Sequence, residues 1–442
     1  MFGTSGVRGR FGEDVTADLA LSIGRALATH GTERIVVGRD PRLTGSLLAD
    51  AVSAGAREYG ADVVRIGVAA TPTIARSVGW YDADAGVAVT ASHNPPEDNG
   101  LKLWTDEGMA FGEDRRRRIA EIVEEGAGEP VAWDETGSET KRTDATDRHR
   151  EALTDAVTIE EPLSVVVDVG NGAGGVTVGA LRDLGCSVTT LGGQPDGRFP
   201  SRPSEPTGAT CETLAAHVAG TDADLGIAHD GDADRTMAVD ERGRFLAGDE
   251  LLALFAGEAV ADGARVVAPV GASLVVDDVV EREGGRVERS RVGDVYVAER
   301  ASEPGVSFGG EPSGAWIWPK QTLAPDGPLA ACRLAALVAR ERPLSQQVAG
   351  LPAYPVERDQ IEVDPTAKER IVDAVARRAN ERYDEIDERD GVRVETDSGW
   401  FLVRASGTQP LVRMTAQGRT EDRTVELTET ARELITEALQ TA

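Results

Sequence analysis

Three aspartates alternate along one short stretch of the chain: Asp230, Asp232 and Asp234. Alternate residues of an extended segment share one face, so we expect these carboxylates to converge on one cation. Oxygen ligands without nitrogen or sulfur suit Mg²⁺, whose remaining ligands are usually water or phosphate oxygens. Arg235 follows directly and can offset the charge or hold a phosphate. The alternatives are a solvated acidic turn and a calcium loop, which would need Glu241 as its twelfth-position ligand.

A candidate nucleophile follows the apolar run 86–89. The segment Thr90 to Pro95 presents a hydroxyl, an imidazole and an amide before a proline that cannot donate to strand pairing. A serine held by a turn at the end of a buried strand can carry a covalent group, which makes Ser92 the candidate, with His93 beside it. Taken alone, such a segment is more often a Ser/Asn/Pro turn without chemistry.

Further loops combine glycine with polar side chains. Glu311 and Ser313 lie in the Gly-rich segment 309–314, which has no nearby cationic cluster in the sequence, and they could hold sugar hydroxyls. Arg8 lies in the glycine-rich segment 3–9, which has neither the spacing of a dinucleotide fingerprint nor that of a P-loop. Structural turns are the alternative for both segments.

The segment 404–410 has the composition of a phosphate cradle. It combines hydroxyls, a flexible glycine and backbone N–H groups with arginines that can bind phosphate oxygens in a fork. A polar hairpin turn is the alternative. The residues that would form this cradle are Arg404, Ser406, Gly407, Thr408 and Arg413.

The elements that must position these loops form a repeat. A strand, a helix and a second strand occur at 34–38, 46–59 and 61–66, at 163–169, 176–184 and 187–191, and at 264–270, 274–282 and 286–289. Each copy continues into a further apolar run that ends at a polar loop: 87–89, 225–228 and 306–308. Short apolar strands alternating with helices predict an α/β fold with mixed, mostly parallel sheets, whose ligands bind at the strand ends.

The C-terminal part differs from these copies. Strands at 361–363 and 401–403 and amphipathic helices at 368–383 and 421–439 predict a smaller α+β domain. We therefore expect four domains, at 1–145, 146–248, 249–354 and 355–442, arranged so that their loops face one central cleft. The polar stretch 126–144 is expected to be a linker.

Composition excludes several classes of protein. The chain has 442 residues, 40% hydrophobic, and a net charge of −29. This acidity argues against nucleic-acid binding and against binding to acidic membranes. No apolar run is long enough to span a membrane and no signal peptide is apparent, so we expect a cytoplasmic protein. With four lysines and 4% aromatic residues, the acidic composition is typical of adaptation to a salt-rich cytoplasm.

The three cysteines do not indicate a disulfide framework or a zinc site. Cys186, Cys211 and Cys332 are odd in number and lack Cys-x-x-Cys spacing, and none of the five histidines shows metal-ligand spacing. We expect the cysteines to be small core residues. The sequence carries no feature that sets an oligomeric state.

Together these segments resemble the α-D-phosphohexomutase superfamily. The resemblance covers the whole chain, with the signature loops in the family's order: 3–9, 90–95 with Asn99, Gly100 and Lys102, 230–235, 309–314 and 404–410. Within the superfamily, the 3–9 and 309–314 segments look most like those of archaeal phosphoglucosamine mutases.

The resemblance implies a mechanism. Ser92 would be a phosphoserine whose phosphate shares a Mg²⁺ with the three aspartates, and it would exchange phosphate between O6 and O1 of a hexose phosphate through a bisphosphorylated intermediate. Glucose or hexosamine 1,6-bisphosphate would be the activator. Arg8, Lys102 and Arg235 would supply positive charge at the transferred phosphate. The 404–410 loop would hold the other phosphate, while Glu311 and Ser313 would contact sugar hydroxyls.

The chain departs from the family pattern at two positions. Many members have a histidine after the Glu-x-Ser-Gly motif, where this chain has Ala315, so the proton-transfer group is left open among Lys102, His93 and Arg8. Gln409 replaces a usual glutamate. Other readings are a phosphomannomutase or phosphoglucomutase, a Mg²⁺-dependent phosphatase acting through Ser92, and a sugar-phosphate-binding protein without catalysis.

Overall fold

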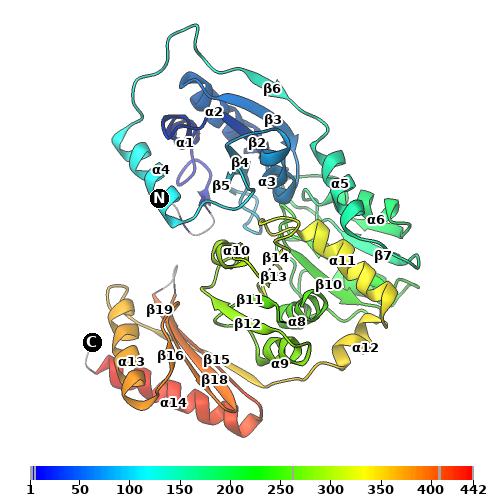
Figure 1. The fold of residues 1–442 in the computed structure, drawn as a ribbon, viewed down its shortest axis with the longest axis vertical. Coiled ribbons are helices and arrows are strands. Elements are labelled where there is room, and N and C mark those ends of the chain that lie inside the picture. The colour runs from blue at the N-terminus through cyan, green and yellow to red at the C-terminus, as the bar shows by residue number, and fades with distance from the viewer. Residues whose placement is uncertain (1–2, 4–5, 261–262, 407–409, 441–442) are drawn as a thin grey trace.

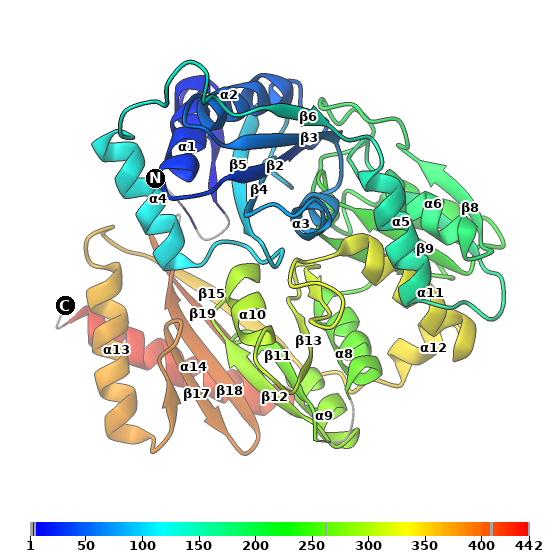
Figure 2. The same cartoon turned by 45° about the horizontal axis from the view of Figure 1, so that its top comes forward.

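Four β-sheets follow one another along the chain in the computed structural model, which describes Gly3 and residues 6–260, 263–406 and 410–440 (Figure 1). The parts built on these sheets follow an arc from the blue N-terminal part to the orange and red C-terminal part (Figure 2). The four-part α/β architecture predicted from the sequence is therefore confirmed. Among the described helices, none is long and apolar enough to cross a membrane.

The first three sheets share one topology, which confirms the predicted repeat. In each, three neighbouring strands are parallel and a fourth strand pairs antiparallel beside them, and each polar loop connects the last of the parallel strands in sequence to this antiparallel strand. In spatial order the strands are β5 (Asp98–Thr105), β4 (Ala85–Val89), β2 (Arg34–Arg39) and β3 (Asp62–Val68); β10 (Thr236–Asp240), β9 (Leu225–His229), β7 (Ser164–Asp168) and β8 (Ser187–Leu191); and β14 (Trp316–Ile317), β13 (Val306–Gly310), β11 (Arg265–Pro269) and β12 (Arg286–Ser290).

Two further strands extend the first sheet. β1 (Val7–Arg10) pairs antiparallel with β5, and β6 (Glu139–Lys141) pairs parallel with β3. The prediction that 126–144 is a linker is thus wrong for Glu139–Lys141. These residues form an edge strand that pairs with β3 through its backbone, although its side chains are exposed. A polar edge strand has no hydrophobic pattern by which it could be recognised.

Helices cover the three sheets and connect their strands. The first group comprises α1 (Ala17–Thr29), α2 (Gly45–Glu58), α3 (Thr71–Trp80) and α4 (Glu113–Glu125). The second comprises α5 (Ala145–Ala156), α6 (Gly175–Asp183) and α7 (Glu212–Ala219). The third comprises α8 (Gly248–Ala259), α9 (Leu274–Arg282), α10 (Asp294–Ala301), α11 (Gly327–Arg340) and α12 (Leu344–Ala349).

The second and third sheets share one hydrophobic core. α11 follows the third sheet in sequence but packs against α6, β9 and β10 of the second, and one cluster of buried side chains joins both sheets. The apolar strands are buried on both faces, as expected for sheets covered by helices on each side. This shared core fixes the second and third loops relative to one another.

The C-terminal sheet is antiparallel throughout, as an α+β domain requires. Its order is β15 (Val356–Glu362), β19 (Leu411–Gly418), β18 (Gly399–Ala405), β17 (Val392–Thr396) and β16 (Ile386–Asp387). Two helices, α13 (Lys368–Arg382) and α14 (Glu421–Leu439), pack against one another and onto this sheet, and the domain has its own core.

Candidate active site

Ser92 lies at the carboxyl end of β4 in a conformation that is rare for serine. Its φ is +52°, its side chain is buried, and its backbone N–H donates to Thr90 Oγ1 at 2.8 Å. Its hydroxyl donates to Asp230 Oδ2 at 2.6 Å, so the first and second loops meet at this atom. A left-handed backbone at a non-glycine residue costs free energy, and the surrounding contacts must maintain it.

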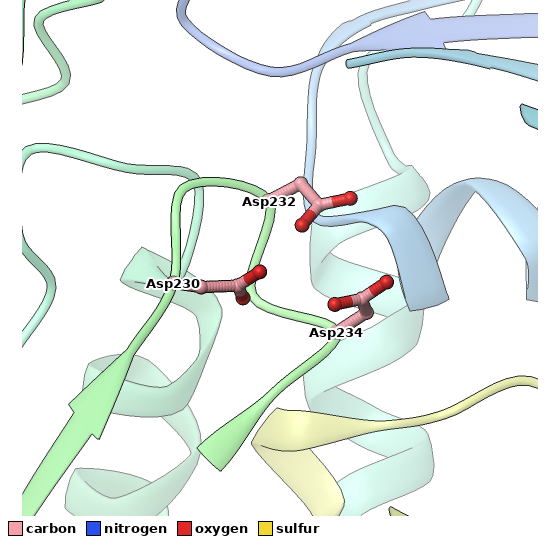
Figure 3. Close-up of side chains that lie close together, drawn as sticks. All are labelled: Asp230, Asp232 and Asp234. Carbon is pink, nitrogen blue, oxygen red and sulfur yellow. The ribbon is translucent and has the colours of Figure 1, made fainter. Parts of the chain in front are cut away.

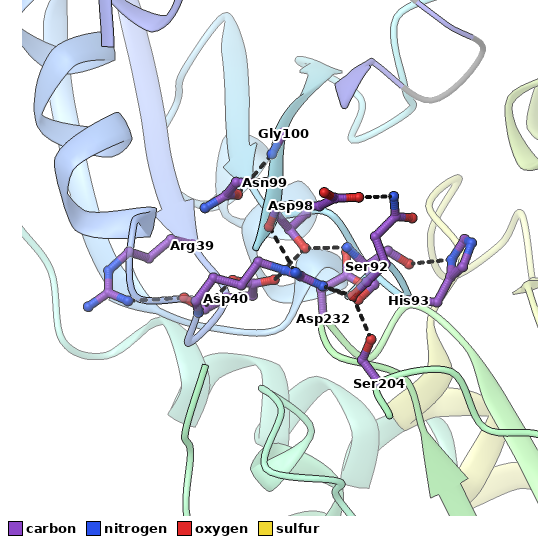
Figure 4. Close-up of polar contacts among 12 residues, drawn as sticks. Arg39, Asp40, Ser92, His93, Asp98, Asn99, Gly100, Ser204 and Asp232 are labelled. Carbon is purple, nitrogen blue, oxygen red and sulfur yellow. Dashed lines mark hydrogen bonds and ion pairs between the residues drawn. The ribbon is translucent and has the colours of Figure 1, made fainter. Parts of the chain in front are cut away.

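A buried arginine provides those contacts. The Arg42 guanidinium donates to four carbonyl oxygens of the Ser92 loop, and its Nε pairs with Asp40 at 3.0 Å. Asp40 also accepts a hydrogen bond from Thr90 Oγ1 at 2.7 Å, which ties the pair to the loop (Figure 4). The four carbonyls, with distances from the guanidinium nitrogens, are those of Ser92 (2.9 Å), Asn94 (2.7 Å), Pro95 (2.5 Å) and Asp98 (2.9 Å).

The second part of the chain also holds this loop from outside. Ser204 Oγ donates to the Asn94 carbonyl at 2.9 Å (Figure 4). The Phe199 ring centroid lies 5.0 Å from the Arg42 guanidinium carbon. The Ser92 loop is therefore fixed between β2, β5 and the loop that follows β8. Sequence reasoning missed Arg42 and Asp40, although both directly follow a buried strand, which is where such sheets place their ligands.

The three aspartates converge in the turn between β9 and β10 (Figure 3). They are buried, and one carboxylate oxygen of each lies within 4.8 Å of the others. The predicted convergence is correct, but the predicted extended conformation is wrong. The segment is a tight turn in which Ala233 has φ +56°, and the turn rather than strand alternation gathers the carboxylates.

The triad fits a divalent cation. Asp232 Oδ1 and Asp234 Oδ1 are buried and accept no hydrogen bond from any described residue, as expected for oxygens that would ligate an ion. Burial and the charges of Asp232 and Asp234 raise the pKa of Asp230 well above its ordinary value, since three carboxylates cannot all ionise cheaply without a counter-ion. Oxygen-only ligation of this kind suits Mg²⁺.

The first domain orients the triad. Thr71, the first residue of α3, donates to Asp232 through its hydroxyl at 2.6 Å and through its N–H to the Asp232 carbonyl at 2.8 Å. Lys102 Nζ lies 3.0 Å from Asp232 Oδ2 and also contacts Asp234. Burial opposes the charge of each group, but their attraction raises the pKa of Lys102 and lowers the pKa of Asp232, so this pair is ionised.

The calcium-loop alternative does not fit. Glu241 follows the far end of β10 and accepts hydrogen bonds from the backbone and side chain of Ser345, which lies in α12. It cannot complete the coordination of an ion held by the three aspartates.

The loops open onto a cleft with a volume of about 830 Å³, lined by residues of all four parts of the chain. Arg8 lines it and donates to Asn94 Oδ1 at 3.3 Å. His93 Nδ1 lies 3.3 Å from Ser92 Oγ. Burial, together with the nearby cations Arg235 and Arg8, lowers the pKa of His93 to about 3, so its imidazole is neutral at physiological pH.

Glu311 and Ser313 line the same cleft. Glu311 Oε1 accepts a hydrogen bond from the Gly293 N–H at 2.7 Å, and Ser313 Oγ is 3.4 Å from Glu311 Oε2. Burial, followed by the charge of Asp294, raises the pKa of Glu311 to about 7. Although no cationic cluster lies near this loop in the sequence, the fold brings several arginines to the cleft: Arg235, Arg291, Arg389 and Arg404.

The fourth loop contributes unevenly within its described residues. Arg404 lines the cleft and pairs with Asp390 at 3.2 Å. The Ser406 carbonyl accepts from Lys368 Nζ at 2.6 Å. Arg413 lies directly opposite Arg404 in the β18–β19 register but does not line the cleft. Gly407 and Thr408 lie outside the described residues.

Three further segments at the cleft were not predicted. The first contains Pro269 and Gly271 at the end of β11. The second is the start of α10, where Asp294 and Tyr296 follow Arg291, and the third is the turn with Arg389 and Asp390 between β16 and β17. The 291–294 segment follows the end of β12, so the repeat logic could have identified it. In the sequence, only the charges of the 389–390 turn could have indicated that it belongs to a site. Ala315 and the buried Trp316 supply no proton-transfer group.

Comparison with known proteins assigns every part of the chain to one family. Four domain models described as phosphoglucomutase/phosphomannomutase match in order: α/β/α domain I at 1–129, II at 147–243, III at 247–354 and the C-terminal domain at 360–434. A protein of Methanopyrus kandleri, named "Probable phosphoglucosamine mutase", is 46% identical over 432 residues, which is 96% of this chain and 95% of that protein.

Solved structures agree with this result. A phosphoglucomutase/phosphomannomutase family protein from Burkholderia thailandensis superposes with a TM-score of 0.89 at 28% identity, covering 99% of this chain and 98% of that one. A putative phosphomannomutase from Thermus thermophilus superposes with a TM-score of 0.80 at 26% identity, with 99% coverage of both chains.

Proposed function

Since the chain belongs to the phosphoglucomutase/phosphomannomutase family, we propose that it is a hexose-phosphate mutase that converts glucosamine 6-phosphate to glucosamine 1-phosphate. It is a phosphotransferase-type isomerase. The observation that carries this proposal is the Ser92 hydroxyl, 2.6 Å from an acidic triad, in a cleft lined with cationic side chains. The amino-sugar assignment is supported by relatives named as phosphoglucosamine mutases, with 46% and 42% identity to the proteins of Methanopyrus kandleri and Methanosarcina acetivorans.

The reaction requires Ser92 to carry a phosphoryl group. Its phosphate passes to O1 of the bound sugar 6-phosphate, and the proton of that hydroxyl leaves with a nearby base. The resulting 1,6-bisphosphate reverses its orientation within the cleft. Its 6-phosphoryl group then passes to the Ser92 oxygen as the bond to O6 breaks, and the base returns its proton to O6, so the enzyme ends as it began. A glucose or hexosamine 1,6-bisphosphate activator would phosphorylate Ser92 initially.

The aspartates 230, 232 and 234 would hold Mg²⁺ together with the Ser92 phosphate. This ion would neutralise charge on the transferred phosphoryl oxygens. Lys102, Arg8 and Arg235 add fixed positive charge at the same end of the cleft. Phosphoryl transfer depends on positioning and charge neutralisation more than on covalent assistance, and the rigid contacts of the Ser92 loop suit this requirement.

Two of the three candidate proton-transfer groups differ in protonation. The raised pKa of Lys102, caused by Asp232 and Asp234 against the effect of burial, keeps its ammonium protonated. His93 is neutral and lies beside the Ser92 oxygen, but the burial and the nearby cations that lower its pKa to about 3 also disfavour its protonated form, so it is a weak proton acceptor. We assign charge stabilisation to Lys102 and Arg8.

The far end of the cleft would hold the phosphate that does not react. Arg404, with the loop that contains Ser406, Gly407 and Thr408, belongs to this grip, and Arg413 supports it from the adjacent strand. Glu311 and Ser313 would accept and donate hydrogen bonds to sugar hydroxyls. The fourth domain would close on bound sugar and thereby exclude water from phosphoserine.

Phosphorus NMR tests the function directly. The protein is incubated in molar KCl with Mg²⁺, a trace of glucose 1,6-bisphosphate, and glucosamine, mannose or glucose 6-phosphate in separate samples. A new 1-phosphate signal that grows fastest with the amino sugar supports the proposal, whereas faster conversion of mannose or glucose phosphate assigns a phosphomannomutase or phosphoglucomutase. Release of inorganic phosphate indicates a phosphatase. Ser92→Ala, which lacks the carrier oxygen, must abolish the 1-phosphate signal.

A further inference from the structure

Cationic side chains line the cleft both near Ser92 and in the fourth domain. Arg8, Lys102 and Arg235 surround His93 at the Ser92 end. At the fourth-domain end, Arg291 Nε donates to the Arg389 carbonyl at 3.0 Å, and Asp390 pairs with Arg404. Both ends are therefore suited to phosphate groups.

The segment 291–294 connects these two ends. Its Val292 N–H donates to Asp390 Oδ2 at 3.0 Å, which anchors it to the fourth domain. Two residues later, Asp294 lines a small pocket together with Lys102, which places Asp294 near the Ser92 end. Asp294 and Glu311 both line the cleft.

The two carboxylates belong to one structural unit. Gly293, with φ +130°, donates its N–H to Glu311 Oε1 at 2.7 Å, so the residue directly before Asp294 is bonded to Glu311. Burial and then Asp294 raise the pKa of Glu311 to about 7, against the opposing effect of Arg235. The fold thus brings together two carboxylates that repel one another, an arrangement that a bound cation would stabilise.

We propose that Asp294, with Glu311 beside it, recognises the 2-ammonium group of an amino-sugar phosphate and distinguishes it from the hydroxyl of glucose or mannose phosphate. The inference deepens the proposed function and rests on it. A hexosamine bisphosphate carries negative charge at both ends, which the cationic side chains near Ser92 and in the fourth domain complement, and positive charge on its ring, which carboxylates that line the cleft can bind. Charge-assisted hydrogen bonds from ammonium to carboxylate are stronger than those from a neutral hydroxyl.

A purely structural role for Asp294 makes a different prediction. Asp294 is the first residue of α10, where a carboxylate interacts favourably with the positive end of the helix dipole. Loss of this carboxylate would destabilise the helix and lower activity equally for every substrate. Only recognition of the ammonium group makes the effect depend on the 2-substituent of the sugar. The decisive quantity is therefore the ratio between an amino sugar and its hydroxyl analogue.

The test compares Asp294→Asn with the wild type on glucosamine 6-phosphate and glucose 6-phosphate. We expect kcat/KM for the amino sugar to fall about 10- to 100-fold, mainly through KM, with less than about a threefold change for glucose phosphate. Asp294→Glu should restore part of the preference. Glu299→Gln, on the same helix but outside the cleft lining, is the matched control and should leave the ratio unchanged.

Calorimetric titration of both sugar phosphates separates this inference from the proposed function. A wild-type preference for glucosamine 6-phosphate that disappears in Asp294→Asn supports recognition even if turnover fails and the mutase proposal is wrong. Equal losses for both ligands, or an unchanged preference, would overturn the role of Asp294 even if the wild type is an active mutase.

Discussion

Replacing Arg42 with lysine tests whether the Ser92 loop must be held in its rare conformation for catalysis. The guanidinium makes five polar contacts: four to carbonyl oxygens of the loop and one to Asp40. A lysine ammonium has three donors on a single nitrogen, so at least two of these contacts are lost while the positive charge remains.

The expected magnitude follows from the backbone of Ser92. Its φ of +52° costs about 1–3 kcal/mol, which the contacts of Arg42 now offset. If Ser92 relaxes in the variant, reaching the reactive geometry requires the same free energy again, so kcat should fall by about 5- to 150-fold. KM should change little, because Arg42 is buried and does not line the cleft.

The assay follows phosphorylation of Ser92 by glucose 1,6-bisphosphate with intact-protein mass spectrometry after rapid quenching, alongside steady-state kcat and the melting temperature. Arg57→Lys is the control, since Arg57 also binds a backbone carbonyl, that of Gly137, at the opposite edge of the first sheet. It should lower the melting temperature without slowing phosphorylation.

One outcome would refute this reasoning. If Arg42→Lys melts at a lower temperature but phosphorylates Ser92 at the wild-type rate, Arg42 contributes to stability only. The conformation of Ser92 would then be set by the rest of the loop, including the hydrogen bond from its N–H to Thr90.

Three further predictions concern the triad, Glu311 and the overall charge. Asp232→Asn should lower kcat by more than about 100-fold and reduce Mg²⁺ binding in a titration, whereas exposed Asp222→Asn should do neither; equal Mg²⁺ affinity in both variants would contradict the metal assignment. Because burial and Asp294 raise the pKa of Glu311 from 4.5 to about 7, the folded state favours its protonated form, and this stabilisation is complete below pH 4.5 and lost as pH rises through 7. Glu311→Gln should therefore raise the melting temperature relative to wild type at pH 8 but not at pH 4.5, because the free energy of unfolding increases by about 3 kcal/mol at most. A difference that does not depend on pH would contradict this prediction, and exposed Glu107→Gln is the control. Finally, with a net charge of −29, the melting temperature should rise between about 0.15 and 1 M KCl as the Debye length falls from about 8 to 3 Å, and an unchanged temperature would argue against adaptation to high salt.

The repeat and the loop positions were predictable because they depend on local pattern. Apolar runs such as 225–229 become buried strands wherever helices cover them, and the polar residues after them must lie at a strand end. The edge strands β1 and β6 were missed since polar or glycine-rich strands are recognisable only by their pairing partners.

The sequence by itself determined the α/β architecture and indicated Ser92 and the three aspartates as candidate site residues, because residue type and spacing carry that chemistry. Only the tertiary structure decided how they meet. A turn at Ala233 gathers the carboxylates, Thr71 and Lys102 come from another domain to hold Asp232, and Arg42 fixes the Ser92 loop. The placement of Asp294 beside Glu311 joins residues on two separate strand ends. Such contacts depend on how whole sheets pack against one another, and no local pattern of side chains encodes which residues of different sheets meet.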